Sequence, residues 1–184
     1  MNRIFIDTEF NRLPYTDEWG QDMDPTRHLK LISIGLVGLR EEDSLYIELA
    51  DGWAENDCNA FTLDTVLPLL EQGDATKTTE DAQLAIAAWL NSFKAPVIVC
   101  DTLIDWLWLM RLLGSSWPAQ LDPVEGCQLA QFNYSSQAEI FDQTYESYFD
   151  VILKPQHHAL HDAKALRAGY LAAEAVIKHE KHRL

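Results

Sequence analysis

The chain has 184 residues, of which 47% are hydrophobic and 10% aromatic, enough for one domain with a substantial core. Fourteen basic and twenty-nine acidic residues give a net charge of −15, which excludes a broad basic surface for nucleic acid. The three cysteines form no Cys-x-x-Cys pattern, which argues against a zinc cluster or a disulfide framework. Because the sequence shows neither a signal peptide nor an apolar run of the roughly eighteen residues that span a membrane, we expect one cytoplasmic domain without membrane contact.

The first part of the chain predicts three strands. Residues 2–10 form an apolar run that ends in two carboxylates, and residues 31–38 are apolar enough for a central strand. Residues 44–50 alternate as a strand with one solvated face does, and they are close enough to residues 31–38 to form a hairpin with them. Residues 11–30, between the first two strands, are polar and rich in turn formers, which predicts a long loop.

Helices are expected next. A short helix is predicted over residues 62–72 and ends at Gly73. Thr79 is expected to cap the following helix. That helix has the clearest helical stripe in the sequence, formed by Ala82, Ala85, Ile86, Trp89, Leu90 and Phe93.

The second half predicts one more strand and three more helices. Residues 96–100 read as a buried strand, and the helix at residues 106–113 is apolar on nearly every side, which indicates the centre of the domain or a subunit interface. Residues 136–148 and 162–179 are expected to be helical. The order of elements predicts an α/β fold with a mixed β-sheet flanked by α-helices, in a single domain.

Acidic side chains occur where three of these elements meet polar turns. Asp7 and Glu9 end the first strand, where residues i and i+2 point to the same side, so both carboxylates can converge on one object. Asp101 and Asp105 follow the strand at 96–100, and Asp162 opens the last helix. A site for two cations about 3.5 to 4 Å apart needs carboxylates from several elements, and oxygen ligands suit Mg²⁺ or Mn²⁺.

Three segments resemble the motifs of the DEDDh-type 3′-5′ exonucleases of the ribonuclease H-like superfamily. The first is Phe5-Ile-Asp7-Thr-Glu9-Phe10; the second is Cys100-Asp-Thr-Leu-Ile-Asp105, whose usual form is His-Asn-x-x-Phe-Asp; the third is His157-His-Ala-Leu-His-Asp162-Ala163. The motifs occur in family order and span nearly the whole chain. The resemblance implies that residues 1–184 form one DEDDh exonuclease domain, similar to the small bacterial exoribonucleases of the mycobacterial type.

The resemblance also implies two bound Mg²⁺ or Mn²⁺ ions and a catalytic set: Asp7, Glu9, Asp105 and Asp162 as metal ligands, and His157 as general base. Asp105 matches the second motif better than Asp101, because the apolar helix follows it directly; Asp101 is left as a neighbour of the site. His157 matches the spacing to Asp162 better than His158 or His161. A histidine there could take a proton from the attacking water, since its ordinary pKa is near 6.5.

The activity implied is the release of nucleoside 5′-monophosphates from single-stranded or short 3′ ends, with RNA favoured over DNA as the nucleic acid substrate. Two alternatives stay open: a 3′-5′ exodeoxyribonuclease of the same superfamily, and a non-catalytic protein-binding domain of the same fold. A homodimer is also expected, because related exoribonucleases are often dimers and the helix at 106–113 offers much apolar surface.

Overall fold

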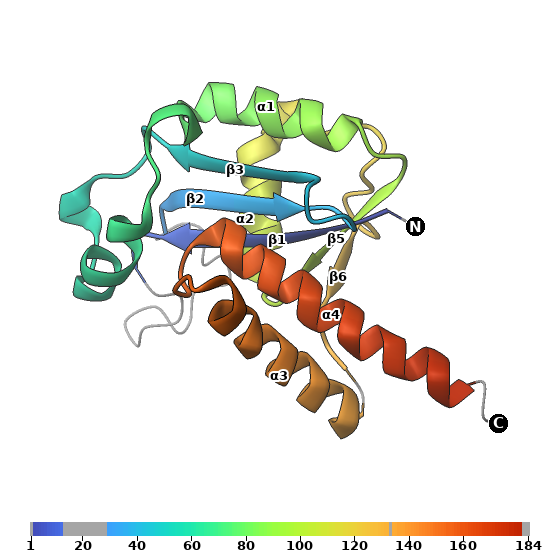
Figure 1. Ribbon diagram of the computed structural model, residues 1–184. Coiled ribbons are helices and arrows are strands. Elements are labelled where there is room, and N and C mark those ends of the chain that lie inside the picture. Colours follow the sequence, from blue (N-terminus) through green and yellow to red (C-terminus); the bar gives the residue numbers. More distant parts are fainter. Residues whose placement is uncertain (1, 13–28, 133, 182–184) are drawn as a thin grey trace, which may run out of the picture.

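The computed structural model describes residues 2–12, 29–132 and 134–181, with the side chains of the last helix up to Val176 (Figure 1). One six-stranded mixed sheet runs through the molecule in the order β4-β3-β2-β1-β5-β6. β2 pairs antiparallel with both β1 and β3, whereas β5 runs parallel to β1, β6 parallel to β5 and β4 parallel to β3. Their bounds are β1 Asn2–Phe10, β2 Leu31–Val37, β3 Ser44–Leu49, β4 Thr76–Lys77, β5 Pro96–Cys100 and β6 Cys127–Leu129.

Helices cover both faces of this sheet. On one face α1 contacts β3 while α2 contacts β1 and β5; on the other face α4 crosses β1, β2 and β3, and α3 lies against α4 (Figure 1). The helices are α1 Thr79–Asn91, α2 Leu103–Leu113, α3 Ser135–Ile152 and α4 Ala159–Lys181. Short helical turns lie between β3 and β4, at Glu55–Asp57, Thr62–Val66, Leu67–Leu69 and Gly73–Ala75, and directly after α2, at Gly114–Ser116.

Alternation along β1 assigns its side chains to the two faces. Ile4 and Ile6 belong to the larger core with α1 and α2, whereas Phe5 belongs to a smaller core with α4. By the same alternation Asp7 and Glu9 project toward the α4 face. The parallel strands β1 and β5 end at the same edge of the sheet, so the residues that follow β5 come close to those that end β1.

The four strands and the long helices expected from the sequence are present. The two short strands β4 and β6 were not predicted, because two or three residues show no alternation pattern. Helices α2 and α4 begin three residues earlier than expected, at Leu103 and Ala159, and α3 extends to Ile152. The predicted loop at residues 11–30 lies outside the described residues except at its ends, which are joined by a 3.0 Å hydrogen bond from the Asn11 amide to the Lys30 carbonyl.

Two local predictions were wrong. The expected helix at residues 62–72 is a π-type turn followed by a 3-10 turn that ends at Leu69, because Pro68 has no amide hydrogen with which to continue the helix. The cap of α1 is Thr78, whose side-chain oxygen accepts a hydrogen bond from the Asp81 amide, whereas Thr79 donates from its amide and hydroxyl to Asp51.

The apolar side chains of α2 are chiefly covered within the chain. Five of them are buried in the larger core: Ile104, Trp106, Leu109, Leu112 and Leu113. The helix is therefore part of the domain centre, and the apolar surface that suggested a homodimer is largely used inside the chain. The homodimer stays a prediction. Among the helices that the structure describes, none combines the length and hydrophobicity required to cross a membrane.

Candidate metal centre

Asp7 and Glu9 lie where β1 leaves the core. In the antiparallel register Asp7 is opposite Gly35 and Glu9 is opposite Ser33. Side chains at paired positions share one face of the sheet, so both carboxylates project from the face that α4 covers. The structure thus places these two predicted site residues on the same side.

Helix α4 can approach this face because Gly35 has no side chain. A Cβ atom at Gly35 would overlap the backbone of Ala159 and Leu160, at distances that real Cβ atoms do not show. The first turn of α4 therefore rests directly on β2, beside Asp7. This close backbone contact brings Asp162 to the acidic end of β1.

Asp162 is buried in the first turn of α4, with 5% of its surface exposed. Its amide donates a 3.0 Å hydrogen bond to the His158 carbonyl, and the Tyr145 hydroxyl donates to its carboxylate at 3.5 Å. Tyr145 belongs to α3, so both helices of this face help to fix the Asp162 side chain.

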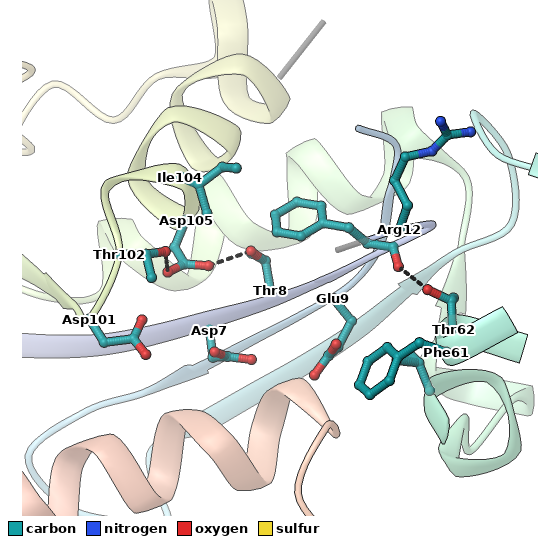
Figure 2. Close-up of a pocket in the computed structure, with 12 residues that line it drawn as sticks. Asp7, Thr8, Glu9, Arg12, Phe61, Thr62, Asp101, Thr102, Ile104 and Asp105 are labelled. Atoms are coloured by element: carbon teal, nitrogen blue, oxygen red, sulfur yellow. Dashed lines mark hydrogen bonds between the residues drawn. The ribbon is translucent and has the colours of Figure 1, made fainter. Parts of the chain in front are cut away.

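The turn after β5 and the first turn of α2 supply one more carboxylate each, Asp101 and Asp105 (Figure 2). Asp105 is buried, and each of its carboxylate oxygens accepts a hydrogen bond from a threonine: Oδ1 from the Thr8 hydroxyl and Oδ2 from the Thr102 hydroxyl at 2.7 Å. Asp101 comes directly after β5 and is exposed. Asp105 is therefore held in one orientation by β1 and by its own turn, whereas the Asp101 side chain faces solvent.

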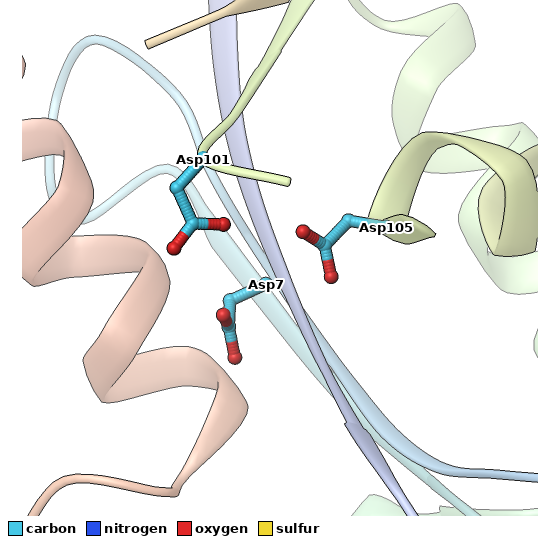
Figure 3. A group of neighbouring side chains, drawn as sticks. All are labelled: Asp7, Asp101 and Asp105. Carbon is cyan, nitrogen blue, oxygen red and sulfur yellow. The ribbon is translucent and has the colours of Figure 1, made fainter. Parts of the chain in front are cut away.

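Asp7 belongs to two groups of three carboxylates among the described residues. Ligand oxygens of Asp7, Glu9 and Asp162 lie within 4.8 Å of one another, and we call them the helix-side group. The same limit holds for Asp7, Asp101 and Asp105, the strand-end group shown in Figure 3. Carboxylates this close repel one another unless they bind protons or share a cation, and their hard oxygens suit a divalent ion. Asp101, which sequence comparison left beside the site, is thus within reach of an ion at the strand-end group.

Burial is the main cause of the unusual electrostatics of Asp7 and Glu9. It raises the pKa of both carboxyl groups well above their ordinary values, and the charges of Asp162 and Asp105 raise each pKa further. Without cations, the end of β1 therefore holds its carboxylates at a cost in free energy.

The other two predicted ligands show the same tendency. Burial and the nearby charge of Asp101 raise the pKa of Asp105 to about 8, even though the two threonine hydrogen bonds lower it. Burial raises the pKa of Asp162 to about 7, although hydrogen bonds from the backbone of His157 and His158 oppose the shift. Groups that bind protons this readily can bind a cation in their place.

The three histidines of the third motif lie in different surroundings. His157 is half-buried, with its ring 4.9 Å from that of Phe61 in an edge-on contact, and burial lowers its pKa. His158 is 5% exposed and is sandwiched between Tyr46 and His161, with 4.4 Å between ring centroids on each side. His158 therefore packs inside the protein, and His157 is the one whose ring meets a residue of the site cavity.

That cavity has a volume of about 130 Å³ and opens at the end of β1. Three residues that sequence reasoning missed line it together with the acids: Arg12, Phe61 and Thr62 (Figure 2). The Thr62 hydroxyl donates to the Phe10 carbonyl at 3.1 Å. The segment that carries Phe61 is thereby attached to β1.

Asn11 adds a second attachment for the same segment. Its side chain, 1% exposed, donates to the Asp57 carbonyl at 3.0 Å, and its carbonyl accepts from the Asn59 amide at 3.0 Å. These contacts join residues about fifty positions apart, so no local pattern in the sequence could have indicated that Phe61 reaches the cavity.

No protein-family model and no curated protein sequence matches the chain. Among solved structures, cell-death related nuclease 4 (CRN-4) matches with a TM-score of 0.50 and 14% identity over 96% of this chain and 64% of CRN-4. S. pombe Pop2p, solved in its Mg²⁺ and Mn²⁺ bound form, matches with a TM-score of 0.49 and 17% identity over 94% of this chain and 81% of Pop2p. This chain thus spans less than two thirds of the length of CRN-4.

At these identities the likeness concerns the fold. The chain has a ribonuclease H-like fold, a mixed six-stranded sheet flanked by helices in a single domain, as the sequence predicted.

Proposed function

We propose that the chain is a DEDDh-type, metal-dependent 3′-5′ exoribonuclease that releases nucleoside 5′-monophosphates from single-stranded or short 3′ ends. The observation that carries the proposal is the position of Asp7 in both the helix-side group and the strand-end group. One carboxylate common to two acidic groups suits two adjacent cations on one phosphodiester. The fold shared with the nuclease CRN-4 adds support.

The donor set fits Mg²⁺ or Mn²⁺, because every candidate ligand is a carboxylate and each predicted ligand has a raised pKa. The ligands of the two ions would be Asp7, Glu9, Asp105 and Asp162, with Asp101 beside them as a fifth carboxylate. Bound ions would supply the positive charge that activates water and stabilises the leaving 3′-oxygen. The hydroxyls of Thr8 and Thr102 hold the Asp105 carboxylate in place for this work.

His157 acts as general base in this proposal. Its lowered pKa keeps the imidazole neutral at pH 7, so that it can accept a proton from the attacking water. Its edge-on contact with Phe61 restricts the orientation of the ring.

The cavity at the end of β1 would hold the 3′-terminal nucleotide. Phe61 offers an aromatic ring for a base, and Arg12 lies on the same cavity as a cation for a phosphate. A single terminal nucleotide held by two cations needs no long basic groove, in agreement with the net charge of −15. The preference for RNA over DNA rests on the resemblance of the motifs to those of exoribonucleases.

Matched single-stranded RNA and DNA oligonucleotides, labelled at the 5′ end, test this function. With Mg²⁺ or Mn²⁺ we expect RNA to shorten one nucleotide at a time from the 3′ end, with 5′-monophosphates as products, and EDTA to stop the reaction. The Asp7→Asn variant is the control for a contaminating nuclease. Faster shortening of DNA would favour the exodeoxyribonuclease, and cations bound without cleavage of either strand would favour the non-catalytic domain.

Assembly and location belong to the proposal as well. The homodimer is tested by sedimentation, in which a species at the monomer mass of 21.0 kDa at micromolar concentration would contradict it. The cytoplasmic location rests on the cysteine pattern and is tested by fractionation of cells that express a labelled chain.

A further inference from the structure

Two cysteines lie side by side on the strands behind the candidate metal centre. Cys100 ends β5 and Cys127 begins β6, and their sulfur atoms are 3.6 Å apart. In the parallel register Cys127 is opposite Ile98, so the two thiols lie diagonally across neighbouring strands on one face of the sheet. Both thiols are free.

The two thiols differ in access to solvent. Cys100 is fully buried in the larger core, whereas Cys127 is partly exposed at its edge. The two thiols are hydrogen-bonded to each other, and this contact, together with burial, raises the pKa of Cys100, whereas it lowers the pKa of Cys127. An oxidant from solvent therefore meets Cys127 first, and Cys100 is the nearest thiol that can react with the product.

We propose that Cys100 and Cys127 form a reversible disulfide when the protein meets a peroxide, and that this bond weakens cation binding at the strand-end group. In the first step the Cys127 sulfur attacks one peroxide oxygen, which gives a sulfenic acid and releases an alcohol, or water from hydrogen peroxide. The Cys100 sulfur then attacks the Cys127 sulfur, forming the S–S bond and releasing water. Each disulfide thus consumes one peroxide, and a small dithiol reverses it.

The strands can accommodate this bond. A disulfide needs sulfur atoms about 2.05 Å apart, so the two sulfurs must approach each other by about 1.5 Å from their 3.6 Å separation. β6 has three residues and pairs with β5 alone among the described strands, so no second strand ladder opposes a shift of Cys127 toward Cys100. The pairing of β5 with β1 ends at Val99. The ladder between these two strands therefore does not hold Cys100 in place.

The effect on the metal centre follows from the chain order. Cys100 directly precedes Asp101, and Thr102, the next residue, donates the 2.7 Å hydrogen bond that holds Asp105. A shift of Cys100 toward β6 therefore displaces two carboxylates of the strand-end group. The helix-side group is built from β1 and α4 and contains neither residue.

The consequence for cation binding rests on the proposed function, but the disulfide itself does not. Wild type, Cys127→Ser and Cys58→Ser are reduced, freed of reductant, and treated with a small excess of hydrogen peroxide. Cys58 is the control, because it lies on the turn after β3 and its sulfur contacts the Ala54 carbonyl rather than a thiol. Peptide mapping without reductant should find a Cys100–Cys127 link, with a mass lower by about 2 Da, in wild type and Cys58→Ser but not in Cys127→Ser.

The same samples are titrated with Mn²⁺. We expect oxidised wild type to bind one Mn²⁺ about tenfold more weakly than reduced wild type, with recovery after dithiothreitol and no change in Cys127→Ser. Absence of the Cys100–Cys127 link would overturn the proposal, and so would a link that leaves Mn²⁺ affinity unchanged. If reduced wild type bound no Mn²⁺, the proposed function would fail and the coupling with it, whereas the peptide map would still decide whether the disulfide forms.

Discussion

The helix-side group and the strand-end group share Asp7 but are assembled differently. The helix-side group depends on the backbone contact of α4 with β2 at Gly35, between segments far apart in the sequence. The strand-end group depends on the short junction from β5 into the first turn of α2, in which Thr102 holds Asp105 and Asp101 stays exposed. One group is therefore set by tertiary packing and the other mainly by local geometry, so substitutions should disable the two groups separately.

Asp7→Asn should have the largest effect, because it removes the carboxylate that both groups share. We expect cleavage to fall by more than about 10³-fold. The fold should persist, with thermal stability without metal equal to or above that of wild type, because one source of repulsion is lost. Initial rates on a labelled RNA oligonucleotide together with circular dichroism would check this, and near-normal cleavage by the folded variant would show that Asp7 is not a ligand.

His157→Ala should remove proton transfer while both groups keep their carboxylates. The rate should fall by about 10² to 10⁴, and Mn²⁺ binding should be kept. Residual activity should rise with pH, since hydroxide can replace the base, whereas the wild-type rate should flatten above the pKa of His157.

A pH–rate series of both proteins measures this, and His158→Ala is the matched control. Because His158 is buried between two rings, its loss should lower stability more than it changes the shape of the pH profile. The base-deficient profile in His158→Ala would assign the base to that residue.

Gly35→Ala should disturb the helix-side group alone. The new methyl group would overlap the backbone at Ala159 and push the start of α4 away from β1. We expect a loss of about 1 to 3 kcal/mol in unfolding free energy and about 10²-fold in rate. Gly38→Ala is the control, because its Cβ would lie 3.2 Å from the Asp43 side chain, away from α4. Equal rates for the two variants would contradict the role given to the Gly35 contact.

Asp101→Asn tests the strand-end group without changing the helix-side group. Its carboxylate belongs to the strand-end group and faces solvent, so we expect about tenfold weaker binding of one Mn²⁺ and no change in the other. Asp150→Asn, an exposed acid on α3, should leave both unchanged. Wild-type affinities for both ions in Asp101→Asn would show that this carboxylate does not take part.

The smallest effect is on the pH dependence of the unfolding free energy, measured in EDTA so that no cation is bound. The folded-state pKa values of Asp105 and Asp162 are raised to about 8 and about 7, above the ordinary value of 3.8 that applies to the unfolded chain. Stability is therefore greatest when these groups are protonated and is lost as pH rises from about 4 to about 8. Urea unfolding should show a fall in unfolding free energy across this window, smaller in Asp105→Asn and absent with saturating Mn²⁺. A metal-free protein whose stability rose through that window because of these carboxyls would contradict the raised pKa values.

The sequence was sufficient to predict the main strands and helices and to predict that the candidate metal-binding acids lie close to one another. Alternation in β1 correctly placed Asp7 and Glu9 on one face, and the junctions before α2 and α4 placed Asp105 and Asp162 near them, because these signals are local to one element. The fit of Asp101 to the strand-end group was harder to see. The sequence favoured Asp105 because the apolar helix follows it directly, and nothing in the sequence indicated that Asp101 also comes within reach of Asp7.

Other features depend on contacts between distant segments. Gly35 looks like any glycine in an apolar strand until α4 is placed on it. Phe61 reaches the cavity through the attachments of Asn11 and Thr62 to the β1 end, and Cys127 meets Cys100 on a strand too short to predict. Such pairings follow from the tertiary fold and have no periodic signature in the sequence.

The most direct test of the shared carboxylate is the number of Mn²⁺ ions bound per chain, measured by calorimetric titration at neutral pH without nucleic acid. The account predicts two ions for wild type, one for Glu9→Gln, which weakens the helix-side group, one for Asp105→Asn, which weakens the strand-end group, and none for Asp7→Asn. A wild-type chain that binds one ion, or an Asp7→Asn variant that keeps two, would contradict it.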